Sequence, residues 1–291
     1  MEFLITFVNG LSLGGIYAMI ALGYTMVYGI AKMLNFAHGD IIMVGGYAIL
    51  VFLWVNPIVA IIALVIFCVL LGIVVEKVAY KPLRGASPLA VLITAIGVSY
   101  LLQSIAQMVF GSAPKYVIIA DLGTLKIGSL SIGYGTIITL ACSIVVMIAL
   151  NVFVKFSKTG RAMIAVSEDK QAAQLMGINV NNIIMITFAI GSALAALAAL
   201  FFLLKAPRIN PTFGAMPGIK AFTAAVIGGI GSIPGAMIGG LLLGLVECFG
   251  QMPGIAAYTG PYIDAIEFSI LIIILLVKPT GLLGKKRREK V

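Results

Sequence analysis

The sequence predicts an all-α, polytopic integral membrane protein: a helical bundle of about 8 transmembrane segments. Of its 291 residues, 62% are hydrophobic and 10% are charged, and the mean hydropathy is +1.17. Several runs approach the roughly 20 apolar residues that a helix needs to cross a bilayer. In a soluble protein the net charge of +9 would suggest nucleic acid binding. Here it fits the Lys and Arg that hold loops on the cytoplasmic side, so no nucleic acid partner is expected.

Apolar runs locate the predicted segments in chain order. They span residues 5–30, 36–55, 58–80, 88–110, 132–155, 183–204, a glycine-broken stretch at 219–250, and 262–278. The first carries an acid and no Lys or Arg ahead of its apolar run, unlike a cleaved signal peptide, so we expect it to remain as a helix. No long polar linker separates the segments, which predicts a single domain over residues 1–291.

The basic residues predict the orientation of the chain in the membrane. If the C-terminal tail lies inside and 219–250 forms a hairpin or a re-entrant pair, 14 of the 19 Lys and Arg fall on the inner side. Lys220 is among the five that remain outside. This places the N-terminus outside and the C-terminus in the cytoplasm. A single crossing at 219–250 would instead put the basic tail on the opposite side.

The stretch VIGGIGSIPGAMIGG, residues 226–240, predicts a break in the seventh segment. Pro234 lacks an amide donor and disfavours helix at the preceding residue, so a bend is expected near Ser232 to Pro234. Small residues four apart also let helices approach closely. Two interpretations remain open: tight helix packing, or a broken element beside a transport pathway. The candidate residues are Gly229, Gly231, Pro234 and Gly235.

The longest inner loop, at about 156–181, predicts a short helix that docks on another surface. Ser167 as N-cap, Glu168 at the positive end and Gly177 as stop predict a helix over 168–176. A helix of fewer than about 12 residues is marginal alone. It therefore needs to pack either on this protein or on a cytoplasmic partner. The candidate residues are Ser167, Glu168, Gln171, Ala172, Ala173 and Gly177.

The segment NFAHGD, residues 35–40, holds the single histidine of the chain. One histidine without a convergent Cys or carboxylate cluster does not make a metal site, and no catalytic signature accompanies it. The segment instead predicts a polar joint between helices, in which Asn35, His38 and Asp40 satisfy helix ends by hydrogen bonding.

Polar residues inside apolar segments are candidates for a translocation pathway, because such residues usually face the bundle interior. Gln103 and Gln107 lie four apart on one predicted helix face. Interhelical hydrogen bonding explains them equally well. Glu247, Asp264 and Glu267 lie toward the outer ends of their segments, where solvation at the membrane interface is an equally good explanation.

Three motifs resemble those of a known family. MLNFAHGDIIMVGGY (33–47) and PTFGAMPGIKAFTAAVIGGIGSIPGAMIGG (211–240) resemble two hallmarks of the branched-chain amino acid permease family, the Liv-type inner-membrane subunits of ABC importers. QAAQLMG (171–177) is similar to the EAA-x-x-x-G loop of ABC-importer permeases, whose short helix docks on the ATPase. It departs from that motif at Gln171, where the motif has glutamate. The resemblance covers essentially the full length.

The resemblance implies a permease subunit that moves small amino acids, Leu, Ile and Val, across the bacterial cytoplasmic membrane. It implies ABC ATPase subunits that carry ATP and Mg²⁺, a second homologous permease and an extracytoplasmic substrate-binding protein. The sequence has no G-x-x-x-x-G-K-[ST] motif, so this chain is expected to be no enzyme and to bind no cofactor or metal. A permease for urea or short amides remains an alternative, as does a stand-alone secondary transporter or channel.

Overall fold

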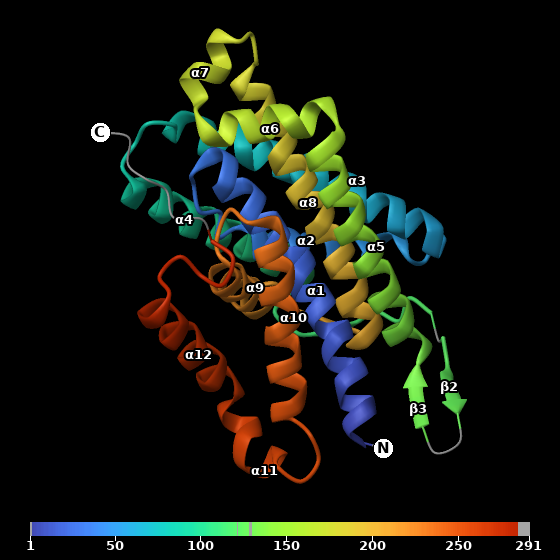
Figure 1. Cartoon of the computed structure of the whole chain (residues 1–291). Helices are drawn as coiled ribbons and strands as arrows, with labels where there is room; N and C mark the ends of the chain where they lie inside the picture. The colour runs from blue at the N-terminus through green and yellow to red at the C-terminus, as the bar shows by residue number, and fades with distance from the viewer. Residues whose placement is uncertain (1, 121, 128–129, 285–291) are drawn as a thin grey trace.

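The computed structural model describes residues 2–120, 122–127 and 130–284, and within them it is a helical bundle with two short antiparallel strand pairs (Figure 1). In chain order the elements are α1 (Glu2–Ala31), α2 (His38–Phe52), α3 (Pro57–Val75), η1 (Glu76–Tyr80), η2 (Lys81–Leu83), α4 (Pro88–Phe110), β1 (Lys115–Tyr116), β2 (Thr124–Ile127), β3 (Leu130–Gly133), α5 (Tyr134–Phe156), α6 (Lys158–Glu168), α7 (Lys170–Leu175), α8 (Val180–Lys205), β4 (Arg208–Ile209), α9 (Ala215–Gly228), α10 (Ile233–Gly250), α11 (Ala256–Thr259), η3 (Gly260–Tyr262) and α12 (Ile263–Val277).

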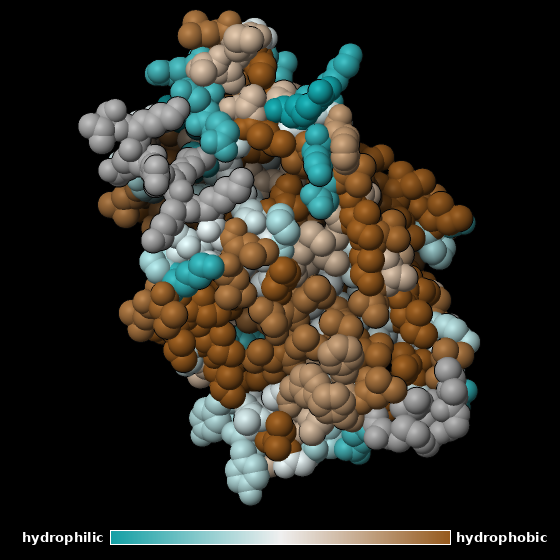
Figure 2. Space-filling view, viewed as in Figure 1, coloured by the Kyte–Doolittle hydropathy of each residue, from teal (hydrophilic) through white to brown (hydrophobic). Residues whose placement is uncertain are grey.

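The predicted helical membrane bundle is confirmed. Seven helical segments of the described chain are long and apolar enough to cross a membrane. An apolar band covers the middle of the molecule, and polar residues gather at its two ends (Figure 2). We call these the loop end, which carries α6 and α7, and the hairpin end, which carries β2 and β3 (Figure 1). Two further apolar helices, α2 and α9, are only 15 and 14 residues long and do not span.

α1 and α8 lie side by side and run in opposite directions. At the hairpin end, the backbone oxygen of Asn9 in α1 accepts a hydrogen bond from Lys205, the last residue of α8, at 3.3 Å. At the loop end, the backbone oxygen of Ala31 accepts one from Lys170, shortly before α8 begins, at 2.9 Å. The two longest helices of the described chain are therefore antiparallel.

The bundle consists of two similar units, α1–α2–α3 and α8–α9–α10, each with a long, a short and a second long helix. α1 packs on α10 while α8 packs on α3, and α2 contacts α8 while α9 contacts α1. Because α1 and α8 are antiparallel, this exchange of partners is the pattern of an inverted-topology repeat. The sequence patterns did not predict it.

The two short helices begin in the middle of the bundle and meet there through glycines. A Cβ atom added to Gly214, the N-cap of α9, would lie 1.7 Å from the carbonyl oxygen of Gly39 in α2. A Cβ atom on Gly39 would lie 2.4 Å from the carbonyl oxygen of Gly214. From this contact α2 runs toward the hairpin end, where Gly46 faces Ile209. α9 runs toward the loop end, where Gly231 lies beside Gly29 of α1.

The glycine-rich stretch serves close packing on two faces of α10. A Cβ atom on Gly235 would lie 2.3 Å from the carbonyl oxygen of Gly228 in α9, and one on Gly239 would lie 2.0 Å from that of Ala224. On another face, Gly240 and Gly244 face α1, where added Cβ atoms would lie 2.4 and 2.1 Å from its backbone. Small residues thus bring three helix backbones together.

The contact between the short helices predicts a steric test. Gly214 has φ −85° and ψ −11°, which any residue adopts, so only its close approach to Gly39 requires glycine. We expect Gly214→Ala to lower the free energy of unfolding by about 1–3 kcal/mol, as overpacking does. Thermal unfolding of the purified protein in detergent measures this. The matched control is Gly97→Ala in α4, where nothing lies within 4 Å of an added Cβ atom. Equal melting temperatures for the two variants would contradict the close contact.

Candidate functional site

His38 packs inside the joint between α1 and α2. It is 1% exposed, and its ring lies 4.8 Å from the ring of Tyr24, measured between centroids. A Cβ atom added to Gly23 would lie 2.4 Å from His38 Nε2, so α1 needs glycine there. No cluster of His, Cys, Asp or Glu that could hold a metal ion includes it among the described residues. His38 is therefore a buried packing residue at the start of α2.

The chain between α1 and α2 turns back from the loop end toward the middle of the bundle. Asn35 in this segment is 2% exposed, and its Oδ1 accepts a hydrogen bond from the Tyr80 hydroxyl at 2.9 Å. The same hydroxyl lies 3.3 Å from the carbonyl oxygen of Leu34. The Tyr80 hydroxyl, at the end of η1, thus provides a donor for the acceptors that the returning segment buries.

Asp40 lies in the first turn of α2, beside the contact of the two short helices. Its side chain is buried, and its Oδ1 accepts a hydrogen bond from Gln103 Nε2 of α4 at 2.9 Å. Gln103 also donates to Ser99 at 3.2 Å. Gln107, one turn further along α4, is exposed and is not part of this group. The structure brings Asp40 and Gln103 together and leaves Gln107 apart.

A cavity of about 240 Å³ lies at this point, and we call it the junction cavity. It is lined by Tyr24, Phe36, Gly39, Asp40, Ile96, Ser99, Tyr100, Gln103, Ala215, Gly218 and Ile219. Both short helices begin at its wall, and neither has a side-chain N-cap. Helix N-termini carry partial positive charge, so this wall favours anions. The buried carboxylate of Asp40 makes the neighbouring part of the wall favour cations.

A second group of charges lies on the other side of α9, and the sequence did not predict it. Lys220 Nζ lies 3.1 Å from Glu247 Oε2, 2.9 Å from Asp264 Oδ1 and 3.3 Å from Glu267 Oε2. The Tyr17 hydroxyl donates to Glu247 at 2.6 Å. The sequence counted Lys220 among the residues on the outer side, but the residue is 6% exposed within α9. Its short helix begins inside the bundle, so the ammonium finds its partners on α10 and α12.

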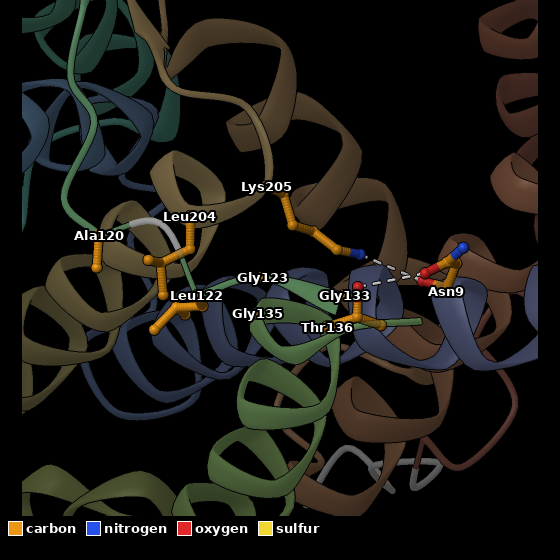
Figure 3. A pocket seen from close by; sticks show the side chains of 9 residues that line it. All are labelled: Asn9, Ala120, Leu122, Gly123, Gly133, Gly135, Thr136, Leu204 and Lys205. Atoms are coloured by element: carbon orange, nitrogen blue, oxygen red, sulfur yellow. Dashed lines mark hydrogen bonds between the residues drawn. The ribbon is translucent and has the colours of Figure 1, made fainter. Parts of the chain in front are cut away.

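A third polar feature is a cavity of about 380 Å³ at the hairpin end, shown in Figure 3. Asn9 lies at one side of it (Figure 3). Its backbone oxygen accepts from Lys205, and its side-chain oxygen accepts from Thr136 Oγ1 at 3.3 Å. Leu204 and Leu122 line the opposite part of the cavity (Figure 3). These bonds join Asn9 to both of the polar side chains that line the cavity with it, Lys205 and Thr136.

The loop at the loop end forms two helices, α6 and α7. The predicted N-cap at Ser167 is wrong: this residue lies in α6 and donates to the carbonyl oxygen of Ile164. Asp169 breaks the helix with φ −150° and caps α7 by accepting from two backbone amides, at 2.8 and 3.0 Å. Glu168 consequently ends α6 and does not begin α7. Asp is as good an N-cap residue as Ser, and Asp169 lies only two residues after Ser167, so the sequence offered both as candidates for the start of this helix.

The predicted stop at Gly177 is confirmed. Its φ is +80°, the amide of Gly177 donates to Gln174 and that of Ile178 donates to Ala173. This pair of bonds is a Schellman motif, which needs a left-handed residue at this position. Ala173 is buried, whereas Gln171 and Ala172 are exposed.

The tip of α7 exposes two large apolar side chains. Leu175 is 89% exposed and Met176 is 82% exposed. On a polar end of a membrane protein such side chains indicate a contact surface. α7 is fixed to the bundle by Lys170, whose Nζ donates to Ala31 at the end of α1. Burial, together with the nearby Arg84 guanidinium, lowers the pKa of Lys170.

The predicted break in the glycine-rich stretch is present between α9 and α10. Gly229 and Gly231 have φ of +106° and +95°, Ser232 caps α10 through Gly235 N–H, and Pro234 lies in the first turn. The segment after α12 completes this turn: the amides of Leu282 and Leu283 donate to the last carbonyls of α9. The pair α9 and α10 is thus a hairpin: the short helix runs from the middle of the bundle to the loop end, and the long one returns to the hairpin end, where Leu245 lies beside Gly10.

Comparison with known proteins identifies the family. Residues 6–276 match the family described as "Branched-chain amino acid transport system / permease component". The chain belongs to this family. The permease is 44% identical to the high-affinity branched-chain amino acid transport system permease protein BraD of Pseudomonas aeruginosa, over 98% of this chain and 96% of the relative. It is 40% identical to LivH of Escherichia coli K12, a protein of the same description, over 100% and 98% of the two chains.

The fold of the permease also resembles a solved structure. It matches a chain of PsaBC from Streptococcus pneumoniae in complex with Fab, with a TM-score of 0.51 over 94% of this chain and 91% of the other. At 15% sequence identity this likeness supports the fold alone.

The Lys220 group predicts a large effect of removing its cation. Lys220→Met leaves three carboxylates without their ammonium, and we expect the free energy of unfolding to fall by about 3 kcal/mol. Thermal unfolding in detergent measures it, with Lys126→Met on the exposed β2 strand as control. Adding Glu267→Gln to Lys220→Met should restore part of the loss, because it removes one uncompensated charge. If the double variant is no more stable than Lys220→Met, the charge argument is wrong.

Proposed function

We propose that this permease is the transmembrane subunit of an ABC importer that moves branched-chain amino acids across the bacterial cytoplasmic membrane by ATP-driven alternating access. The relatives at 44% and 40% identity, aligned over nearly their whole lengths, are named for this transport. The single structural observation that carries the proposal is α7, a short capped helix with exposed Leu175 and Met176 at one end of the bundle.

The partners follow from this assignment. Two ABC ATPase subunits bind and hydrolyse ATP with Mg²⁺ and contact α7, and a second related permease completes the membrane part. An extracytoplasmic binding protein delivers the amino acid to the hairpin end. The loop end and the C-terminus face the cytoplasm, and the N-terminus lies outside. This orientation gives the cytoplasmic side the excess of Lys and Arg.

The structure supplies a route by which α7 acts on the membrane helices. Lys170 in α7 bonds to the last residue of α1, and the segment that follows α1 leads directly to Asp40 and the junction cavity. Closure of the ATPases shifts α7, and with it the end of α1. The two inverted units then rock about their contact, so that the pathway opens to the other side.

The docking helix predicts a selective loss of the ATPase. In the double variant Leu175→Glu/Met176→Glu, two charges replace the apolar surface, so we expect the ATPase to dissociate. The tagged chain is purified in mild detergent from its own cells, and its partners are identified. Gln171→Glu is the matched control, because it adds charge to the same helix but restores the residue of the similar loop motif, and it should retain the ATPase.

Co-purification of the second permease distinguishes a loss of docking from a misfolded variant. It should co-purify with wild type and with both variants, since α7 lies at one end of the bundle. A double variant that keeps the ATPase would refute the docking assignment. A wild-type chain that purifies alone would contradict the importer proposal, and gradient-driven flux from that chain would then indicate a secondary transporter or channel.

Competition identifies the transported solute. In membrane vesicles that contain the whole importer and its binding protein, uptake of labelled leucine should fall when unlabelled isoleucine or valine is added. Urea and acetamide at the same concentration should leave it unchanged. Competition by urea or acetamide, with none by valine, would move the permease to the alternative substrate class.

A further inference from the structure

Asp40 differs from every other buried acid of the described chain in having no cation. The other buried acids of the described chain, Glu76 and Glu267, pair with Arg84 and Lys220. The buried Asp40 carboxylate accepts hydrogen bonds from Gln103 and Ser99, but no Lys or Arg nitrogen lies within ion-pair distance of it among the described residues. A carboxylate at membrane depth is costly unless it is paired, and such residues mark the paths of ions and substrates.

The junction cavity presents a second binding feature a short distance from Asp40. Ala215 and Gly218, in the first turn of α9, line the same space. This helix has 14 residues and no side-chain cap. The amides of Ala215 and Gly218 already donate to the carbonyl oxygens of Thr212 and Gly214, so this turn attracts a ligand through the partial positive charge of the helix start. That charge beside a carboxylate without a cation offers one anion-binding and one cation-binding position.

The rest of the wall is apolar and reaches the surface of the chain. Phe36, Ile96 and Ile219 line it, and Tyr100 stands at its edge. Ile96 and Ile219 are 42% and 43% exposed, so the cavity opens between α4 and α9.

We propose that the junction cavity binds the transported amino acid in transit, with its ammonium on the Asp40 carboxylate, its carboxylate at the start of α9 and its branched side chain against Ile96 and Ile219. The inference rests on the proposed function and names the residues that recognise the substrate. It requires a zwitterion: an analogue that lacks either charge loses one of the two polar contacts.

Cysteine protection tests the site without altering Asp40. Ile219→Cys is introduced into the whole importer in nanodiscs, with Cys142 and Cys248 changed to serine, and the rate of maleimide labelling is measured. Leucine should slow labelling severalfold. At the same concentration, 4-methylpentanoate, which lacks the ammonium, and 3-methylbutylamine, which lacks the carboxylate, should protect much less. Met108→Cys, on the exposed part of α4, should label equally with and without leucine.

The Asp40 variants assign the ammonium contact. Asp40→Asn should lower leucine uptake by about tenfold, the value of a lost charge-assisted bond, and should abolish protection of Ile219→Cys by leucine. Asp40→Glu, which keeps the charge, should retain more uptake and more protection than Asp40→Asn. Co-purification of the ATPase with Asp40→Asn shows that the variant is assembled.

The outcomes separate this inference from the proposed function. If wild-type importer takes up leucine but leucine fails to protect Ile219→Cys, or 4-methylpentanoate protects equally well, the junction site is wrong and the transport proposal stands. Unchanged protection in Asp40→Asn overturns the role of Asp40. If the wild-type importer takes up no branched-chain amino acid, the proposed function itself fails.

Discussion

The bundle depends on one constraint: two helices begin halfway through an apolar layer, where no water satisfies their ends. Non-helical backbone is tolerated at that depth only where protein buries it or it lines a cavity. Here α2 and α9 meet at Gly39 and Gly214, at a distance that a single Cβ atom would prevent. The long helices α1 and α8 cover the contact from both sides, and glycines in α10 let α1 and α9 come close enough to do so.

The placement of charges follows from the same two helix ends. Helix N-termini stabilise anions and disfavour cations, so Asp40 in the first turn of α2 is favourably placed. Lys220, in the second turn of α9, is not. Three carboxylates surround its ammonium and offset both the helix end and the loss of water. One short helix thus carries an acid that lacks a cation, and the other carries a cation with a surplus of acids on its far side.

Composition and local chemistry were enough to predict the membrane bundle, the break before Pro234 and the stop at Gly177, because each depends on a few neighbouring residues. They were not enough to distinguish a short helix that begins halfway across the apolar layer from a helix that spans it. α2 and its approach are as apolar as a true span, so residues 36–55 resembled a crossing. The Lys220 group could not be predicted for the same reason. Its acids lie on α10 and α12, and Lys220 reaches them because α9 is short and begins inside the bundle. The hydrogen bond between Asp40 and Gln103 could not be predicted either, because it joins α2 to α4 and no local sequence pattern specifies how these two helices pack.

The inverted arrangement gives each short helix an anchor at a different end of the molecule. α2 ends beside Ile209 at the hairpin end, while the last carbonyls of α9 are bonded to Leu282 and Leu283 near the loop end. In the alternating access that we propose, a rotation of one unit against the other would separate the two units at one end and bring them together at the other, with the glycine contact as the fixed point. Since α7 is bonded to α1, which packs on α10 of the opposite unit, a force applied at α7 acts on both units at once. A solute held where the short helices meet would be exposed to each side in turn without leaving its binding residues.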